Sequence, residues 1–196
     1  MDNKEFMEIA EKVWAFHTKR APGIPIATEM VLIAQRELGE KKIAAIAETR
    51  ACLPDPIQVL TGCTIANGGL KMYDEIGRYA LTLYNRKSGK GVRVYVDMNK
   101  IDKDKMPETY KFFTRTRDPE LRTNMELRKA SGEKVVEEFL AANRDIFTFQ
   151  HVTIKDPGKL PVPPVAICEK CKESFTVRQP DDKLCLVCSG ELAYYS

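Results

Sequence analysis

The sequence predicts an α+β domain followed by a small metal-binding ribbon. Apolar residues recur at helical spacing through much of the first 40 residues, and β-branched and aromatic runs follow at 79–84 and 92–96. Near the end of the chain, two Cys-x-x-Cys pairs come after a proline-rich stretch. The order of helices, strands, helices and a last strand favours α+β over a regular parallel α/β repeat.

The first two helices are indicated by signals at their ends. Asp2 and Glu5 have the spacing of a capping box, which opens a helix that ends near Arg20. A second helix is expected over residues 25–38, with a proline in its first turn and Gly39 as its C-terminal cap.

Shorter elements are expected next. Residues 43–48 read as a buried strand, and a short helix follows through residue 61, with Asp55 as its N-cap and a proline in its first turn. The two β-branched runs separated by NRKSGKG predict a hairpin. The remaining expected elements are exposed helix and loop over 103–131, a helix over 132–142 and a strand over 147–154.

Composition excludes several classes of protein. The 196 residues are 43% hydrophobic and 30% charged, which is enough apolar material for a core and argues against global disorder. No uncharged apolar run reaches the roughly 18–20 residues of a membrane span, and the first residues lack the pattern of a secretory signal. The net charge of +3 is too small to imply a polyanionic partner. We therefore expect a cytoplasmic protein with reduced cysteines and no membrane partner.

A proline-rich segment divides the chain. Residues 155–164, KDPGKLPVPP, contain four prolines and one glycine, a composition typical of a stiff connector. The expected organisation is an α+β domain over 1–154, this linker, and a ribbon over 165–196 that holds four of the six cysteines.

The four cysteines of the ribbon have the spacing of a tetrahedral metal site. Each Cys-x-x-Cys pair closes a tight turn that points two sulfurs the same way, and thirteen residues separate the pairs. Zinc is favoured over iron, because Lys172 and Ser189 stand where a rubredoxin-like iron site usually has glycine. The predicted ligands are Cys168, Cys171, Cys185 and Cys188.

The charge of the ribbon argues against nucleic-acid binding. Residues 165–196 carry four cations and five anions, and four thiolates around a zinc ion add further negative charge. Phosphate backbones are bound by clustered cations, so a structural or protein-binding ribbon is the better interpretation.

The remaining two cysteines bracket the short helix. Cys52 and Cys63 lie eleven residues apart, with Asp55 and Gln58 between them, and each cysteine sits at the end of an element. Side chains at such ends can converge on one pocket, where Asp55 or Gln58 could donate to or accept from His17. The alternative is that both thiols only fill space in the core, since free cysteine is often buried.

Three segments carry a resemblance to a known family. FHTKRAPG (16–23), CLPDPIQVLTGCTIANGGL (52–70) and GRYALTLYNRKSGKGVRVYV (77–96) resemble the FmdE subunit of molybdenum or tungsten formylmethanofuran dehydrogenase and FmdE-like proteins generally. The resemblance implies a helix-backed mixed or antiparallel sheet, similar to the catalytic domain of glyceraldehyde-3-phosphate dehydrogenase. Some members of that family carry a C-terminal zinc ribbon.

The resemblance also implies a metal or reactive site. His17, Cys52 and Cys63 match the family motifs, whereas Lys19 and Ala21 stand where the family has a histidine and a cysteine. A three-ligand site for a second metal remains chemically possible. Alternatively, Lys19 replaces the charge of the metal and lowers the pKa of a cysteine, or the site is lost and its residues only pack.

The combined observations predict a zinc-binding accessory or subunit-like protein of an anaerobic molybdenum or tungsten enzyme. The chain has no ferredoxin-like cysteine run, so the redox centre is not expected in this chain, and whether it is an enzyme stays open. The alternatives are a stand-alone thiol or metal-dependent enzyme and, less favoured, a nucleic-acid-binding ribbon protein. The apolar stripe of the first helix and the family resemblance predict a homodimer.

Overall fold

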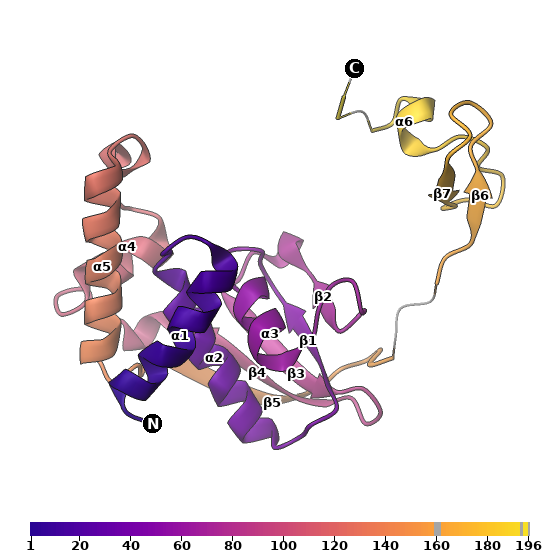
Figure 1. Cartoon of the computed structure of the whole chain (residues 1–196). Coiled ribbons are helices and arrows are strands. Elements are labelled where there is room, and N and C mark those ends of the chain that lie inside the picture. Colours follow the sequence, from indigo (N-terminus) through magenta and orange to yellow (C-terminus); the bar gives the residue numbers. More distant parts are fainter. Residues whose placement is uncertain (159–161, 193, 196) are drawn as a thin grey trace. The chain divides into compact units, whose positions relative to one another are not determined.

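The computed structural model describes residues 1–158, 162–192, 194 and 195 (Figure 1). Two compact units, Met1–Lys159 and Leu160–Ser196, divide the chain within the proline-rich segment. No helix of the described residues is long and apolar enough to cross a membrane.

A five-stranded mixed sheet forms the centre of the first unit. Its strand order is β2-β1-β3-β4-β5, with β1 and β2 parallel and every other neighbouring pair antiparallel. The antiparallel β3–β4 pair is the hairpin that the sequence predicts. The strands are β1 (Ile43–Ala47), β2 (Leu70–Met72), β3 (Ala80–Asn85), β4 (Lys90–Val96) and β5 (Phe147–Thr153).

Helices back this sheet. Figure 1 shows α1 (Asn3–His17), α2 (Gly23–Leu38) and α3 (Pro54–Thr61) together over the strands, with α2 packed directly on β3 and β4. Short 3-10 turns interrupt the loops at Asp74–Ile76, Met98–Lys100 and Pro119–Arg122. A second helical pair, α4 (Pro107–Thr114) and α5 (Met125–Ala141), precedes the last strand. The predicted helix-backed α+β architecture is therefore confirmed.

The first helix begins as its sequence predicts. Asp2 accepts a hydrogen bond from the Glu5 backbone N–H at 2.9 Å, and the Glu5 carboxylate accepts one from the Asp2 backbone N–H at 3.3 Å. This reciprocal pair satisfies two of the donors that a helix start leaves free. The helix ends at His17, because Thr18 adopts the left-handed conformation with φ 63°.

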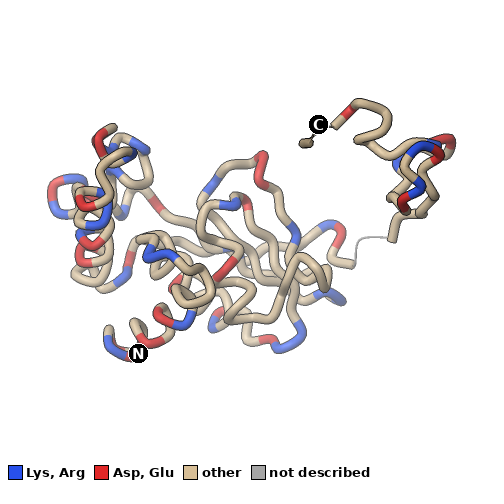
Figure 2. The backbone as a smooth tube through the Cα atoms, turned by 45° about the horizontal axis from the view of Figure 1, so that its top comes forward, with Lys and Arg blue, Asp and Glu red and all other residues tan. Residues whose placement is uncertain are grey.

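The fifth helix begins earlier than the sequence predicts. A helix is expected from residue 132, whereas α5 starts at Met125, where the side chain of Asn124 accepts from the Leu127 backbone N–H. Lys, Arg, Asp and Glu positions are mixed along this part of the chain (Figure 2). Its first turns therefore show no apolar periodicity, which is why the pattern reveals only the second half of the helix.

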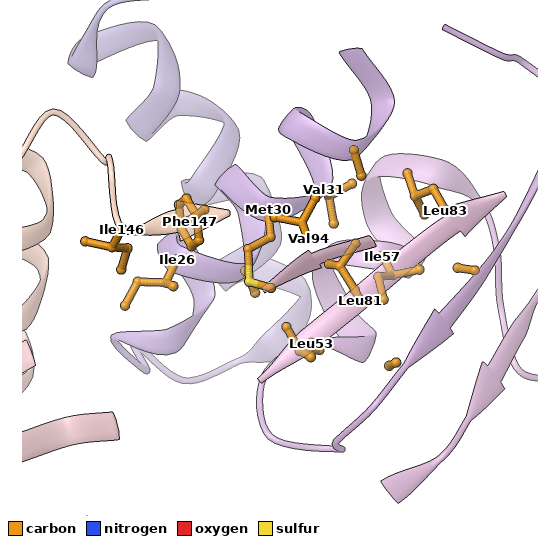
Figure 3. Close-up of a cluster of buried hydrophobic side chains, with 14 of the residues drawn as sticks. Ile26, Met30, Val31, Leu53, Ile57, Leu81, Leu83, Val94, Ile146 and Phe147 are labelled. Carbon is orange, nitrogen blue, oxygen red and sulfur yellow. The ribbon is translucent and has the colours of Figure 1, made fainter. Parts of the chain in front are cut away.

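The core lies between the sheet and α2. The pairing register places Ala45, Leu83 and Val92 side by side, and the same face carries Ala47, Leu81 and Val94 one step along. All six are at most 1% exposed. Figure 3 shows Met30 and Val31 of α2 and Ile57 of α3 among the side chains that fill this core.

A buried carboxylate follows β1. Glu48 is 5% exposed and accepts two hydrogen bonds from Arg93, from Nε at 2.6 Å and from a terminal nitrogen at 2.9 Å. Arg78 donates a further bond at 2.8 Å. Burial alone would raise the pKa of Glu48, but the two arginines lower it below its usual value. The contacts of Glu48 with the two arginines therefore stabilise the fold fully at pH values above the unfolded-state pKa of this carboxyl. This contribution is lost as the pH falls through the lower, folded-state pKa.

Replacement of Arg93 by methionine is expected to destabilise the α+β domain by about 3 kcal/mol at neutral pH, because a buried carboxylate loses its two-point partner. The free energy of unfolding in urea measures this loss. Arg50→Met is the matched control: Arg50 also pairs with a carboxylate, Asp74, but its side chain is 82% exposed. The control should cost much less than Arg93→Met, because solvent screens an exposed ion pair. Equal losses in the two variants would contradict this account.

The second unit is a small two-stranded ribbon with one helical turn. β6 (Val165–Ile167) and β7 (Ser174–Thr176) pair antiparallel, with Ala166 opposite Phe175. α6 (Leu186–Ser189) follows and ends at Gly190, which adopts the left-handed conformation with φ 83°. Each strand has only three residues, so the backbone of this unit supplies little structure of its own.

Candidate functional site

The ribbon brings its four cysteines together. Their sulfur atoms all lie within 4.8 Å of one another, and the sulfurs of Cys171 and Cys185 are 3.9 Å apart. Four sulfurs at about 2.3 Å from a tetrahedral zinc ion lie about 3.8 Å from one another, so the spacing and the donor set fit the metal. The four are Cys168, Cys171, Cys185 and Cys188.

Local backbone geometry positions these thiols. Cys168 directly follows β6, and its carbonyl accepts from the backbone N–H of Lys172, a residue with φ 64°. The Cys185 backbone N–H points at the Cys168 sulfur at 3.4 Å. Backbone N–H groups of Cys171 and Cys185 lower the pKa of the Cys168 thiol to about 6, which favours the thiolate that binds metal.

The start of α3 carries a second arrangement of polar side chains. His17, the last residue of α1, forms a 2.6 Å hydrogen bond from its Nδ1 to the carboxylate of Asp55. The prediction that Asp55 is the N-cap of α3 is wrong, because Leu53 is the N-cap and Asp55 lies in the first turn. Its carboxylate is free to hold the histidine for this reason. The sequence predicts that Asp55 or Gln58 bonds to His17, and the structure shows this bond for Asp55.

Cys52 lies against the first turn of α2 and near enough to Asp55 to be affected by its charge. Its backbone has φ 59°, and a Cβ atom on Gly23 would come within 2.9 Å of the Cys52 sulfur and 2.9 Å of the Tyr79 hydroxyl. That hydroxyl donates to the Gly23 carbonyl at 2.9 Å. Gly23 therefore has room for no side chain, and the thiol and the phenol are held against the first turn of α2. Gly23 and Tyr79 lie within two of the segments that resemble the FmdE family, but only the fold shows that they are neighbours of Cys52.

Cys63 lies at the opposite end of α3. It is 4% exposed, and its thiol donates to the Ile43 carbonyl at 3.5 Å. The helix between the two cysteines has eight residues and a length of about 12 Å. Among the described residues, the ribbon cysteines form the only group of three or more His, Cys, Asp or Glu side chains that could hold a metal ion. The structure therefore does not bring His17, Cys52 and Cys63 together as ligands of a second metal, which corrects the predicted convergence.

Comparison with known proteins decides the family. Residues 16–148 match the family described as "FmdE, Molybdenum formylmethanofuran dehydrogenase operon". The chain belongs to the FmdE family. The ribbon lies outside the matched residues, and the resemblance drawn from the sequence motifs is confirmed.

Two individual proteins are similar to this FmdE family member. One, known from a crystal structure, is a tungsten formylmethanofuran dehydrogenase FmdE-like protein from Syntrophus aciditrophicus, with 33% identity and a TM-score of 0.79 over 97% of this chain and 95% of that one. The other is a "Probable S-adenosyl-L-methionine-binding protein" of Archaeoglobus fulgidus, 31% identical over 92% of this chain. The chain spans about half (52%) of the length of this curated relative.

The two departures from the FmdE motif have different surroundings. Ala21, which stands in place of a cysteine, packs with Cys52 against Val13, Trp14 and Ile24, and its carbonyl accepts from the Trp14 indole at 2.9 Å. Lys19 is exposed and lines a separate hollow of about 230 Å³ beside α1. Among the described residues, no hydrogen bond or ion pair joins Lys19 or Gln58 to His17, so their roles remain predictions.

The surroundings of Cys52 make it a poor nucleophile. Burial, and secondly the negative charge of Asp55, raise the pKa of its thiol to about 11. Only about one thiol in ten thousand is then ionised at pH 7. This opposes the alternative of an enzyme that uses Cys52 as a thiolate.

Alkylation of Cys52 by iodoacetamide is expected to speed up continuously from pH 7 to pH 10, because the thiol has a pKa of about 11. Mass spectrometry of the modified peptide in the native chain gives the rate. Asp55→Asn should increase the rate by roughly threefold to tenfold at a fixed pH by removing a neighbouring negative charge. Asp104→Asn is the matched control, since this exposed residue lies in a different loop. A rate that levels off below pH 8 would contradict the raised pKa.

Proposed function

We propose that this FmdE family protein is a zinc-binding accessory or subunit-like protein of a molybdenum or tungsten enzyme. The observation that carries the proposal is the cluster of four cysteine sulfurs within 4.8 Å of one another. The family description and the similarity to a tungsten formylmethanofuran dehydrogenase FmdE-like protein support the connection to molybdenum and tungsten enzymes. The four thiols must stay reduced to bind metal, so the proposal places the chain in the cytoplasm. That the organism is an anaerobe belongs to the same proposal and rests on the connection to molybdenum and tungsten enzymes.

The zinc ion has a structural role in this proposal. Four thiolates complete its coordination and leave no position for a substrate or a water molecule. The ribbon has two three-residue strands and one helical turn, and Val165 and Ile167 are both 69% exposed. A unit with so small a core needs the free energy of metal binding to stay folded.

The α+β domain has a binding role rather than that of a thiol enzyme. Cys52 is protonated at neutral pH, and Cys63 is buried against a backbone carbonyl. The histidine–carboxylate pair remains as the group that can contact a ligand, because His17 and Asp55 have side chains 22% and 28% exposed. A hydrogen bond to a carboxylate fixes the tautomer and the orientation of an imidazole, which suits a ring that receives a ligand at Nε2.

Elemental analysis tests the proposed metal. The full chain is expected to hold one zinc ion, and the Cys168→Ser/Cys185→Ser variant is expected to hold none. Cys52→Ser/Cys63→Ser is the matched control, because it also removes two thiols but leaves the ribbon unchanged and should retain the metal. Iron in place of zinc, or metal that survives in the ribbon variant, would overturn the proposed zinc site.

Assembly is a further part of the proposal. We expect a homodimer, formed in part by α1, whose Phe16 is 56% exposed. Light scattering should give twice the mass of one chain, and a monomer would overturn this part.

Isolation of the native protein, with molybdenum and tungsten measured beside zinc, tests the proposed partner. A chain that is recovered with zinc alone and without a partner enzyme would argue against the accessory role.

A further inference from the structure

A cationic pocket lies at the far end of α3 from His17. It is a cavity of about 770 Å³ between the C-terminal end of α3, the entry to β1 and the turn that joins β3 to β4. This volume is within the range of sites that bind metabolites and cofactors. Its charged lining residues are four cations and one acid, namely Lys41, Lys42, Arg86, Lys87 and Glu40.

Most of this positive charge is available to a ligand. Lys41, Lys42 and Lys87 are exposed, and none of them forms an ion pair within 4.0 Å in the part of the chain that the structure describes. The Glu40 carboxylate accepts a hydrogen bond from the Asn85 amide at 2.9 Å and keeps its negative charge, so the four cations and one acid leave a net charge of +3 around the pocket. Like charges held close together repel one another, and an anion between them removes that repulsion.

Two asparagines fix the loops that form the walls of the cationic pocket. The Asn67 side chain accepts from the backbone N–H groups of Thr64 and Gly69 and donates to the Gly62 carbonyl, with distances of 2.8–3.0 Å. Asn85 accepts from the backbone N–H groups that follow it in the β3–β4 turn, at 2.8 and 3.1 Å. Each loop therefore keeps its shape through side-chain bonds to its own backbone.

A cation ties the two walls together. Arg86 donates from its guanidinium to the Gly68 carbonyl at 2.9 Å, which links the β3–β4 turn to the loop after α3. The backbone is also closely packed at Gly69, where a Cβ atom would lie 2.8 Å from the Cys63 Cα and 2.6 Å from the Asn67 side-chain oxygen. The loops of the cationic pocket and the guanidinium of Arg86 are thus held before a ligand arrives, which lowers the entropic cost of binding at this cation.

We propose that the cationic pocket binds a small molecule that carries a phosphate group, such as a nucleotide. Phosphate is the anion that suits several convergent Lys and Arg side chains, because its oxygens accept charge-assisted hydrogen bonds in several directions. The volume of the pocket accommodates more than the phosphate alone. This site is independent of the zinc ribbon and of the His17–Asp55 pair, so it goes beyond the proposed function.

Calorimetric titration of the full zinc-loaded chain with adenosine monophosphate tests the proposal, with adenosine as the uncharged probe and citrate as the carboxylate probe. We expect the nucleotide to bind and adenosine and citrate to bind at least roughly tenfold more weakly. The Lys42→Gln/Lys87→Gln variant should weaken nucleotide binding by roughly tenfold or more, because it removes two of the four cations.

Lys12→Gln/Lys103→Gln is the matched control, since both lysines are exposed and neither lines the pocket. It should bind the nucleotide as the unmodified chain does, and thermal melting should show that both variants are folded. Four outcomes would overturn the proposal: no nucleotide binding at millimolar concentration, equal binding of adenosine, equal binding of citrate, or equal losses in the two variants. If the pocket variant fails to fold, two single variants, Arg86→Lys and Lys87→Gln, replace it. Unchanged nucleotide affinity in both single variants would overturn the proposal.

Discussion

Removal of the proposed zinc ion is expected to unfold the ribbon and to leave the α+β domain folded. The ribbon has few buried apolar side chains, so we expect its folded state to depend on the proposed metal, whereas the domain has an apolar core between the sheet and α2. The two parts can be followed separately. Trp14 is the single tryptophan of the chain and lies in the α+β domain, so its fluorescence should stay unchanged when a chelator is added.

Hydrogen exchange measured by mass spectrometry reports on the ribbon in the same experiment. Peptides from β6, β7 and α6 should lose all protection when zinc is removed, and peptides from β3 and β4 should keep theirs. The Cys168→Ser/Cys185→Ser variant should behave in the same way without a chelator, and Cys52→Ser/Cys63→Ser should keep its ribbon protected. A ribbon that stays protected without metal, or a Trp14 signal that collapses with it, would contradict this expectation.

Replacement of Phe139 by alanine is expected to destabilise the α+β domain by about 4 kcal/mol. Phe139 of α5 is fully buried and makes edge-to-face contacts with Phe6 and Phe147, at ring-centroid distances of 6.2 and 5.8 Å. The three rings come from α1, α5 and β5, so the substitution leaves a cavity where three parts of the chain meet. Urea unfolding followed by the fluorescence of Trp14 measures the loss.

Phe149→Ala is the matched control for this substitution. Phe149 lies on β5 two residues beyond Phe147, but its side chain is 41% exposed. Its loss should cost about 1 kcal/mol or less, because less apolar surface returns to water and no closed cavity remains. Similar losses for the two phenylalanines would contradict the assignment of Phe139 to the core.

The elements with strong local signals could be predicted from the sequence. The capping box at Asp2, the glycine cap at Gly39 and the β-branched hairpin each depend on neighbouring residues, so the local pattern contains the information. The strand Leu70–Met72 has no such signal, because three residues are too few for a period. It forms because β1 offers an edge for parallel pairing, which is a property of the fold.

The same contrast between local signals and the fold explains why the sequence predicts the ribbon cluster but not the arrangement of side chains around α3. Four ligands within 21 residues are confined by two tight turns, so their spacing predicts the cluster. The separation of Cys52 from Cys63 depends instead on the direction of α3, which sequence spacing does not give. The role of Asp55 depends on where α1 ends in space. Because α1 ends beside α3, the carboxylate of Asp55 bonds to His17 instead of capping the backbone of α3.

The short helix α3 has a mechanical consequence for the domain. Asp55 in its first turn holds the histidine, and Thr61 and Gly62 at its other end line the cationic pocket. A hydrogen-bonded helix of two turns is a short rigid rod that holds its two ends about 12 Å apart. Leu53 and Ile57 anchor the rod in the core, since both are 0% exposed. The core therefore fixes the distance and the direction from the histidine to the wall of the cationic pocket, since one anchored helix sets both.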